Sequence, residues 1–124
     1  MYLFVVFKVF YINCILINSY VLGGFFLISS RYVAIKSDGK ELLLTIEIDV
    51  PEVDPTLETG DYRCKFSVSA MGINEYIYGV DAIQSYCMAL KRLKNFFNGF
   101  ISEGWKFYFP GYLDMEVDII STYF

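Results

Sequence analysis

The sequence predicts an α+β fold with two layers, in which an antiparallel sheet of about four to six strands packs on one long helix. Two observations predict this fold. Segments in which apolar residues alternate with other residues lie on both sides of one segment whose apolar residues recur every three or four positions. The first period is typical of half-buried antiparallel strands, and the second is typical of an amphipathic helix. One helix against one antiparallel sheet forms two layers.

Two hairpins are predicted before the helix. Residues 41–50 alternate, and residues 32–36 form a shorter strand joined to them by the Asp-Gly turn of residues 37–40. Residues 62–70 and 73–80 form the second hairpin, after an acidic loop that begins at Pro51. The residues predicted to face inward are Leu42, Leu44, Ile46, Ile48 and Val50 in the first hairpin and Tyr62, Cys64, Phe66, Val68 and Ala70 in the second.

The period changes at Asp81, which begins a helix of about 20 residues that ends near Gly104. Asp81 is followed three residues later by Gln84, which is the spacing of a capping box. The predicted buried stripe consists of Ile83, Cys87, Leu90, Leu93, Phe97 and Ile101. Residues 105–109 and 113–120 then read as short strands around a Pro-Gly turn.

Residues 1–30 form a separate hydrophobic segment before the domain of residues 31–124. Lys8 is the only charged residue of the segment, so the domain carries 9 basic and 14 acidic side chains, a net charge of −5. Residues 9–28 are an uncharged run of 20 residues, about the length that crosses a bilayer core. Two interpretations remain open: a membrane anchor, or a start codon assigned too early in an A/T-rich gene. A signal peptide is disfavoured because no small-x-small cleavage site follows.

Both open interpretations place the domain in the cytoplasm, either free or anchored to the membrane through residues 9–28. More positive charge follows the run than precedes it, which favours a cytoplasmic C-terminal side. The three cysteines are an odd number, which fits a reducing compartment. Cys64 and Cys87 are both predicted to pack in the core, and a disulfide between them is left open.

Three short stretches resemble a family of small bacterial proteins of unknown function, the DUF6968-type family. They are Gly60-Asp-Tyr-Arg-Cys-Lys-Phe66, Tyr78-Gly-Val-Asp-Ala-Ile-Gln84 and Ala89-Leu90. The resemblance covers roughly residues 32–100 and implies a fold, but no activity. The chain departs from the family pattern at Tyr62 in place of Trp, at Lys65 in place of Pro, and at Ser85-Tyr86 in place of Ala-Leu. Proteins of this family begin near the first strand, which favours a start assigned too early here.

Composition excludes several classes of function. The chain has no histidine, which removes His-dependent nucleophile pairs and His-ligated zinc. The net charge of −4 argues against a nucleic-acid partner, because binding to phosphates depends on clustered Lys and Arg. The remaining expectation is a small acidic binding domain, not an enzyme, whose partner is a basic protein.

The alternative is a small-ligand-binding protein or a carboxylate-based enzyme that uses the crevice between sheet and helix. Its best candidate ligand-binding residues are Asp81, Gln84, Glu47 and Asp49, although capping explains the first two equally well. No catalytic residue is assigned. No cofactor or metal ligand is predicted, because the acidic loop lacks the spacing of an EF-hand. A concave pocket lined by these four residues would favour the alternative.

Overall fold

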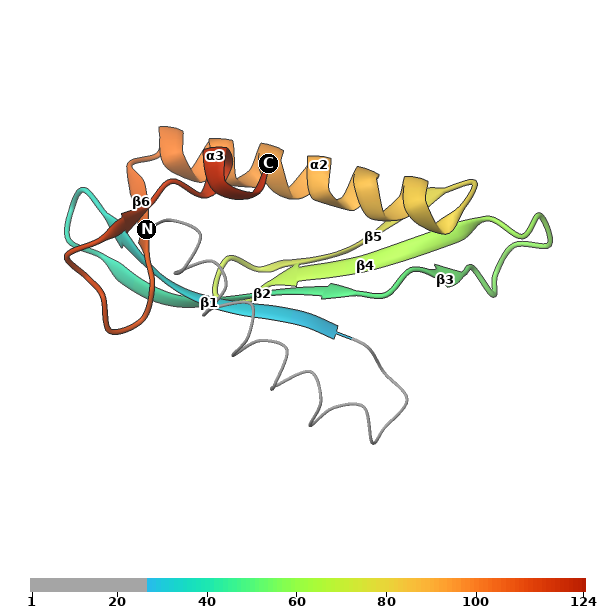
Figure 1. Cartoon of the computed structure of the whole chain (residues 1–124), viewed down its shortest axis with the longest axis horizontal. Coiled ribbons are helices and arrows are strands. Elements are labelled where there is room, and N and C mark those ends of the chain that lie inside the picture. The colour runs from blue at the N-terminus through green and yellow to red at the C-terminus, as the bar shows by residue number, and fades with distance from the viewer. Residues whose placement is uncertain (1–26) are drawn as a thin grey trace.

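The computed structural model describes residues 27–124, and within them the α+β class is confirmed (Figure 1). The elements in chain order are β1 (Leu27–Lys36), β2 (Glu41–Asp49), β3 (Glu52–Val53), β4 (Tyr62–Val68), β5 (Ile73–Gly79), α2 (Ala82–Ser102), β6 (Trp105–Tyr108), β7 (Glu116–Val117) and α3 (Ile119–Tyr123). Helix α2 has 21 residues, close to the expected length.

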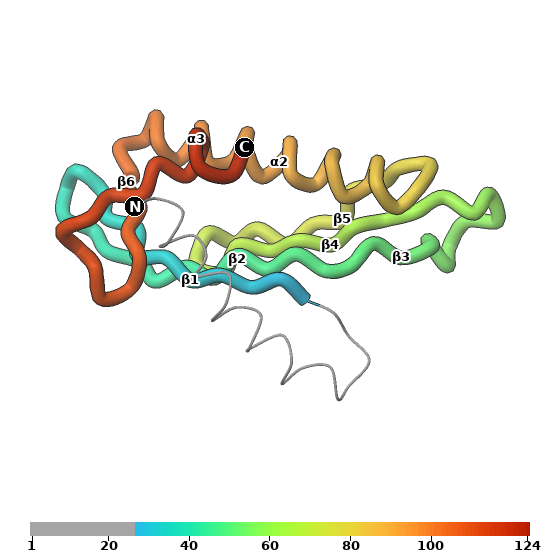
Figure 2. Tube along the Cα trace, viewed as in Figure 1, coloured from blue at the N-terminus to red at the C-terminus, as the bar shows by residue number. Residues whose placement is uncertain are grey.

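The strands form one antiparallel sheet of seven strands, more than the four to six expected. The order is β3-β4-β2-β1-β6-β7, and β5 pairs with β4. The additional strands are short: β3 and β7 have two residues each, too few to produce a period in the sequence. Helix α2 runs along one face of the sheet and α3 lies beside it, so both described helices cover the same face (Figures 1 and 2).

Strand β1 begins five residues before the predicted start at Tyr32. It pairs with β2 along nearly its whole length, from Leu27 opposite Asp49 to Ile35 opposite Glu41. The last four residues of the predicted hydrophobic segment therefore belong to the sheet. Within residues 27–124, no helix has both the length and the apolar character needed to cross a bilayer. Residues 9–26 of the predicted membrane run lie outside the described residues.

The faces predicted for β2 and β4 are confirmed where the strands cross the core. Leu44 and Ile48 of β2 are buried, as are Cys64, Phe66 and Val68 of β4. The two ends of the predicted faces are exceptions, because Val50 is exposed and Ala70 lies in the turn after β4. The core is completed from α2 and β6 by side chains including Leu93, Phe97, Trp105 and Phe107.

The buried stripe of α2 confirms the prediction at Leu93 and Phe97 and differs from it elsewhere. Its buried residues are Ser85, Ala89, Leu93 and Phe97, whereas Ile83 is 76% exposed and Ile101 is 43% exposed. At the start of α2 the difference follows from a close approach at Gly79 of β5, where a Cβ atom would lie 2.5 Å from the backbone nitrogen of Ser85. Only a small side chain fits where the two backbones approach each other, so Ser85 is the buried residue of this turn and Ile83 points to solvent.

The prediction of a strand over residues 113–120 is wrong beyond its centre. Only Glu116 and Val117 pair with β6, and the chain then enters α3. Asp118 is the N-cap of α3, and its carboxylate accepts a hydrogen bond of 3.1 Å from the backbone N–H of Ser121. The alternation of Met115, Val117 and Ile119 therefore spans a strand, a cap and the start of a helix.

Candidate binding site

Asp81 and Gln84, two of the predicted ligand-binding residues, cap the N-terminus of α2. The Asp81 carboxylate accepts a 2.7 Å hydrogen bond from the backbone N–H of Gln84. The Gln84 side-chain oxygen accepts a 2.7 Å hydrogen bond from the backbone N–H of Val80. The capping interpretation is thus confirmed, with the glutamine reaching one residue further back than in the usual capping box.

Glu47 and Asp49, the other two, lie on the opposite side of the sheet from α2. They alternate along β2 with Leu44, Ile46 and Ile48, whose side chains lie in the core or pack against it. Glu47 and Asp49 therefore point away from the helix. Partial burial raises the pKa of the Asp49 carboxyl, while the nearby Lys65 acts in the opposite direction. The structure therefore does not bring the four residues together in a crevice between sheet and helix.

The acidic loop after β2 uses part of its charge internally. The Asp54 side chain is 2% exposed, and it accepts hydrogen bonds from the backbone N–H and the hydroxyl of Thr56. These bonds hold the pKa of Asp54 below its usual value. Glu52 forms an ion pair of 2.7 Å with Arg63. Within residues 27–124, no cluster of three acidic or cysteine side chains is arranged to hold a metal ion.

The two described cysteines differ in burial. Cys64 is fully buried as expected, and burial raises the pKa of its thiol to about 11. Cys87 is exposed, so the prediction that it packs in the core is wrong: in this part of α2 the buried residues are Ser85 and Ala89, and Cys87 lies on the solvent side. Both thiols are free, and the disulfide that the sequence left open is not formed in this structure.

This contrast predicts selective alkylation in a Cys14→Ser variant of the full chain. Iodoacetamide near neutral pH is expected to modify Cys87 rapidly, whereas Cys64 should react only after unfolding in urea, because the thiolate is the reactive form. Peptide mass spectrometry over a time course measures both rates. Equal rates for the two cysteines in the folded protein would contradict the assigned burial.

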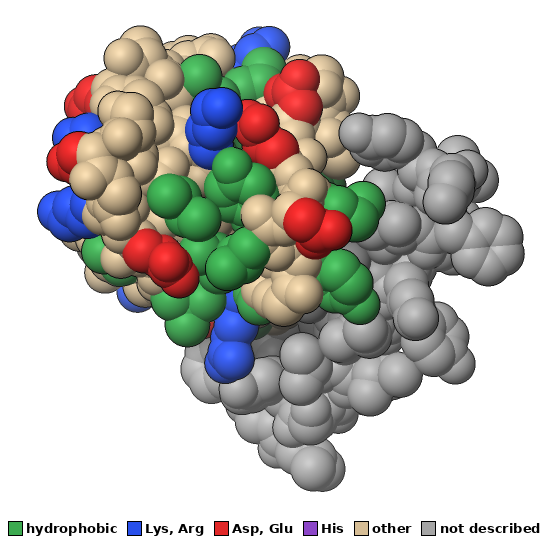
Figure 3. Space-filling model, turned by 90° about the vertical axis from the view of Figure 1, so that its left-hand side faces the viewer, with side chains coloured by type: hydrophobic (Ala, Val, Ile, Leu, Met, Phe, Trp, Pro, Cys, Tyr) green, Lys and Arg blue, Asp and Glu red, His purple; other side chains and the backbone are tan. Residues whose placement is uncertain are grey.

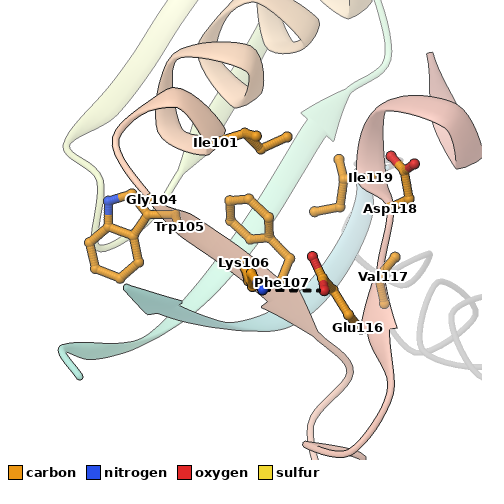
Figure 4. Close-up of a pocket in the computed structure, with 9 residues that line it drawn as sticks. All are labelled: Ile101, Gly104, Trp105, Lys106, Phe107, Glu116, Val117, Asp118 and Ile119. Carbon is orange, nitrogen blue, oxygen red and sulfur yellow. Dashed lines mark ion pairs between the residues drawn. The ribbon is translucent and has the colours of Figure 1, made fainter. Parts of the chain in front are cut away.

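A cavity of about 520 Å³ lies at one end of the sheet, where α2 ends and the chain returns through β6 and β7 to α3 (Figure 4). It is lined by Ile101, Gly104, Trp105, Lys106, Phe107, Glu116, Val117, Asp118 and Ile119. None of the four residues predicted from the sequence lines it. The lining residues come from four consecutive elements, so the cavity depends on the point at which the chain leaves the sheet after β7.

The cavity has apolar side chains in its walls and charged side chains at its border; of the apolar ones, Ile101 is 43% exposed, whereas Phe107 and Ile119 are buried. The side chains of Ile101, Phe107 and Ile119 point toward the same space from α2, β6 and α3 (Figure 4). Lys106 and Glu116 form an ion pair across the neighbouring strands, with 3.9 Å between Nζ and Oε2. Hydrogen bonds from Ser121 hold the pKa of Asp118 below its usual value, so this carboxylate is charged at neutral pH.

The surface around the cavity is apolar at its centre, with charges around it. Figure 3 looks at this end of the molecule and shows hydrophobic side chains gathered between acidic and basic ones. The loop between β6 and β7 contributes three exposed apolar residues, Tyr112, Leu113 and Met115. We call the cavity together with this loop the β6–β7 site.

The backbone N–H and C=O groups of Trp105, at the β6–β7 site, form hydrogen bonds with none of the described strands. Gly104 accepts a 3.2 Å hydrogen bond from Ser37, so its carbonyl faces β1. Because successive residues of a strand direct their backbone groups to opposite sides, the N–H and C=O of Trp105 face away from β1. Strand β7 pairs only with Phe107 and Tyr108, so no described strand pairs with Trp105 on this side.

Sequence reasoning missed this site because no motif marks it. Trp105 and Phe107 read as ordinary core residues of a strand, and Ile119 was assigned to the same strand as Glu116. One signal could have located the end of β7. Asp118 stands directly before two apolar residues, Ile119 and Ile120, which is a pattern of helix starts.

Comparisons of the chain with protein-family models, curated proteins and solved structures gave no match.

Proposed function

We propose that this protein is a binding module, not an enzyme, and that the β6–β7 site takes a basic, apolar-containing segment of another protein. The observation that carries the proposal is the 520 Å³ cavity, which has apolar walls and a charged border. An apolar cavity with a few charged groups at its edge is the usual form of a binding site. The proposal gives the acidic binding domain expected from the sequence a specific surface.

The charges at the site favour a basic partner. Glu116 and Asp118 line the cavity, and Glu103 and Asp114 are near the lining residues in the chain. The basic residues are Lys106 in the lining and Lys36, whose Nζ lies 5.7 Å from the centroid of the Trp105 ring. Lys106 and Glu116 form an ion pair, and no ion pair among the described residues involves Asp118, Glu103 or Asp114. A surface of one sign attracts a partner of the other sign and excludes partners of the same sign.

The backbone groups of Trp105 that pair with no described strand favour an extended partner segment. An added strand gains affinity from main-chain hydrogen bonds to an open sheet edge and specificity from the pockets that its alternate side chains enter. At the β6–β7 site, the open edge at Trp105 borders the cavity. A segment that lies along this edge directs an apolar side chain toward the partly exposed Ile101 while its basic residues meet the carboxylates at the border.

A second candidate function is the binding of a small organic cation. The volume of the cavity favours it, because sites for small molecules commonly measure about 300–1,000 Å³. The carboxylates of this version are Glu116 and Asp118, and not the four residues predicted from the sequence. A polyamine such as spermine is a suitable probe, since it offers charge without an apolar side chain or a peptide backbone.

Trp105 gives a direct reading of binding, because it is the only tryptophan of the chain and lines the cavity. We expect its fluorescence to change in a saturable way when the full chain is titrated with a 12-residue peptide of alternating Lys and Leu. Glu116→Lys is expected to weaken the binding roughly fivefold, equivalent to about 1 kcal/mol, because it reverses a charge at the border.

The matched control is Glu58→Lys, which makes the same change of charge on an exposed residue of the acidic loop far along the chain. It should leave the affinity for the Lys-Leu peptide unchanged at about 0.15 M salt, where exposed charges are screened beyond roughly 8 Å. Equal weakening by both variants would mean that net charge alone attracts the peptide, which would contradict the proposed site. Saturation by spermine without any response to the peptide would favour the second candidate.

A further inference from the structure

Strand β5 forms an open edge of the sheet. It runs for seven residues, Ile73–Gly79, beside β4 and beneath α2 (Figure 2). Its only pairing partner among the described strands is β4. Exposed edge strands usually carry lysine, proline or a bulge that prevents pairing with another chain. The sequence of β5 contains no basic residue and no proline, and its register with β4 is unbroken.

The backbone groups that face this open edge can be assigned. Ser69 donates a 3.0 Å hydrogen bond to Thr45 of β2, so odd-numbered residues of β4 face β2 and even-numbered residues face β5. Phe66 is opposite Glu75, so odd-numbered residues of β5 direct their backbone groups to β4. The N–H and C=O groups of Asn74, Tyr76 and Tyr78 therefore face outward.

We propose that two copies of the protein associate through antiparallel pairing of their β5 strands, with Tyr76 of one copy opposite Tyr76 of the other. In this register Asn74 lies opposite Tyr78 of the second copy. All three outward-facing residues of each strand then meet outward-facing residues of the partner strand, which is the arrangement of a hydrogen-bonded antiparallel pair. Such a contact has two-fold symmetry and closes on itself.

The side chains on the open face of the sheet suit this self-pairing. Tyr76 and Tyr78 are exposed, and pairs of aromatic side chains on neighbouring strands stabilise a sheet. The Tyr76 ring is held in place by Arg63, whose guanidinium carbon lies 4.3 Å from the ring centroid. No charged residue of β5 lies on this face, so the proposed register places no like charges opposite each other.

The side chains on the helix-covered face are also compatible with a second copy. Glu75 is the only charged residue of β5, and it is paired with Arg92 of α2 at 3.3 Å. Its charge is thus neutralised within its own copy. Met88 lies one turn before Arg92 and is 43% exposed, so it offers apolar surface next to the edge. A basic foreign strand would find no unpaired carboxylate on β5, which favours a second copy as the occupant.

The register can be tested by cysteine cross-linking of the full chain in a Cys14→Ser, Cys87→Ser background. Tyr76→Cys is expected to form a disulfide-linked dimer on mild oxidation, because hydrogen-bonded residues opposite each other have Cα atoms roughly 5.5 Å apart. The matched control Tyr78→Cys should not cross-link to itself, because the two copies of residue 78 would lie roughly 13 Å apart. Adding Asn74→Cys to Tyr78→Cys should restore the covalent dimer.

Asn74→Lys provides a second test that does not depend on chemical trapping. A lysine at the open edge should convert the dimer to a monomer in analytical ultracentrifugation, while far-UV circular dichroism shows the fold unchanged. Tyr112→Lys, at a similarly exposed residue remote from β5, should leave the dimer intact. A wild-type monomer, cross-linking by Tyr78→Cys as efficient as by Tyr76→Cys, or a dimer unaffected by Asn74→Lys would each overturn the proposal.

Discussion

Phe97→Ala is expected to lower the free energy of unfolding by about 3–5 kcal/mol, the usual cost of truncating a fully buried phenylalanine. Phe97 is completely buried on α2. Its ring makes an edge contact with Phe107 of β6 at 5.2 Å between centroids and stacks with Phe124 at 6.3 Å. The side chain thus joins the helix, the sheet and the C-terminal residue, and its removal leaves a cavity at their junction.

The free energy is measured by urea titration of the full chain, followed by circular dichroism. Met88→Ala is the matched control, because it truncates a large apolar side chain that is partly exposed on the same helix. It should cost less than about 1 kcal/mol, since less apolar area leaves contact with the protein and alanine favours the helix. A loss of similar size for both variants would contradict the assigned core.

Gly79→Ala is expected to destabilise the protein by about 1–3 kcal/mol, the usual cost of forcing extra volume into a packed site. The added Cβ would lie 2.5 Å from the nitrogen and 3.0 Å from the Cα of Ser85. These are backbone atoms at the start of α2, so they cannot move aside as a flexible side chain can. The helix must shift away from β5, which also disturbs the caps at Asp81 and Gln84.

Gly99→Ala is the matched control for this prediction. Gly99 lies within α2, and nothing is within 4 Å of the position of its added Cβ. The same substitution there should raise the free energy of unfolding by roughly 0.5–1 kcal/mol, because alanine has the higher helix propensity. The two variants therefore have opposite expected signs in the same urea titration. A stable Gly79→Ala variant would mean that α2 does not approach β5 closely.

The strands of the two hairpins could be predicted from the sequence because each buries one face against the helix. Residues 41–50 and 62–70 alternate clearly, and the structure places Leu44, Cys64 and Phe66 in the core as expected. Strand β1 was predicted only in part. Leu27 and Ile28 sit at the end of a long apolar run, where no change of pattern marks the beginning of a strand.

The position and cap of α2 could also be predicted, as could Leu93 and Phe97 of its buried face, but the rest of that face could not. Counting apolar residues favoured Ile83 and Ile101, both of which are exposed. The buried positions Ser85 and Ala89 are defined by how closely the helix approaches the sheet. That distance depends on Gly79, on a different element, so the period of the helix alone does not contain it.

The candidate site could not be predicted because it is a cavity that forms only where several elements meet. The sequence indicates Asp81 and Gln84 as a polar pair that could bind a ligand, but in the structure their side chains cap α2. The cavity arises where β7 leaves β6 after two residues and Asp118 starts a helix. Short strands and caps of this kind depend on tertiary contacts more than on local pattern, so the residues around them carry little advance signal.

The most direct test of the proposed binding function is an NMR titration of the ¹⁵N-labelled full chain with the Lys-Leu peptide. We expect the largest amide shift changes at Trp105, Lys106 and residues 116–119, where the open strand edge borders the cavity. Amides near Glu47 and Asp81 should change little. Saturable shift changes centred on Glu47, Asp49, Asp81 and Gln84, with none at Trp105, would contradict the β6–β7 site and return support to the residues predicted from the sequence.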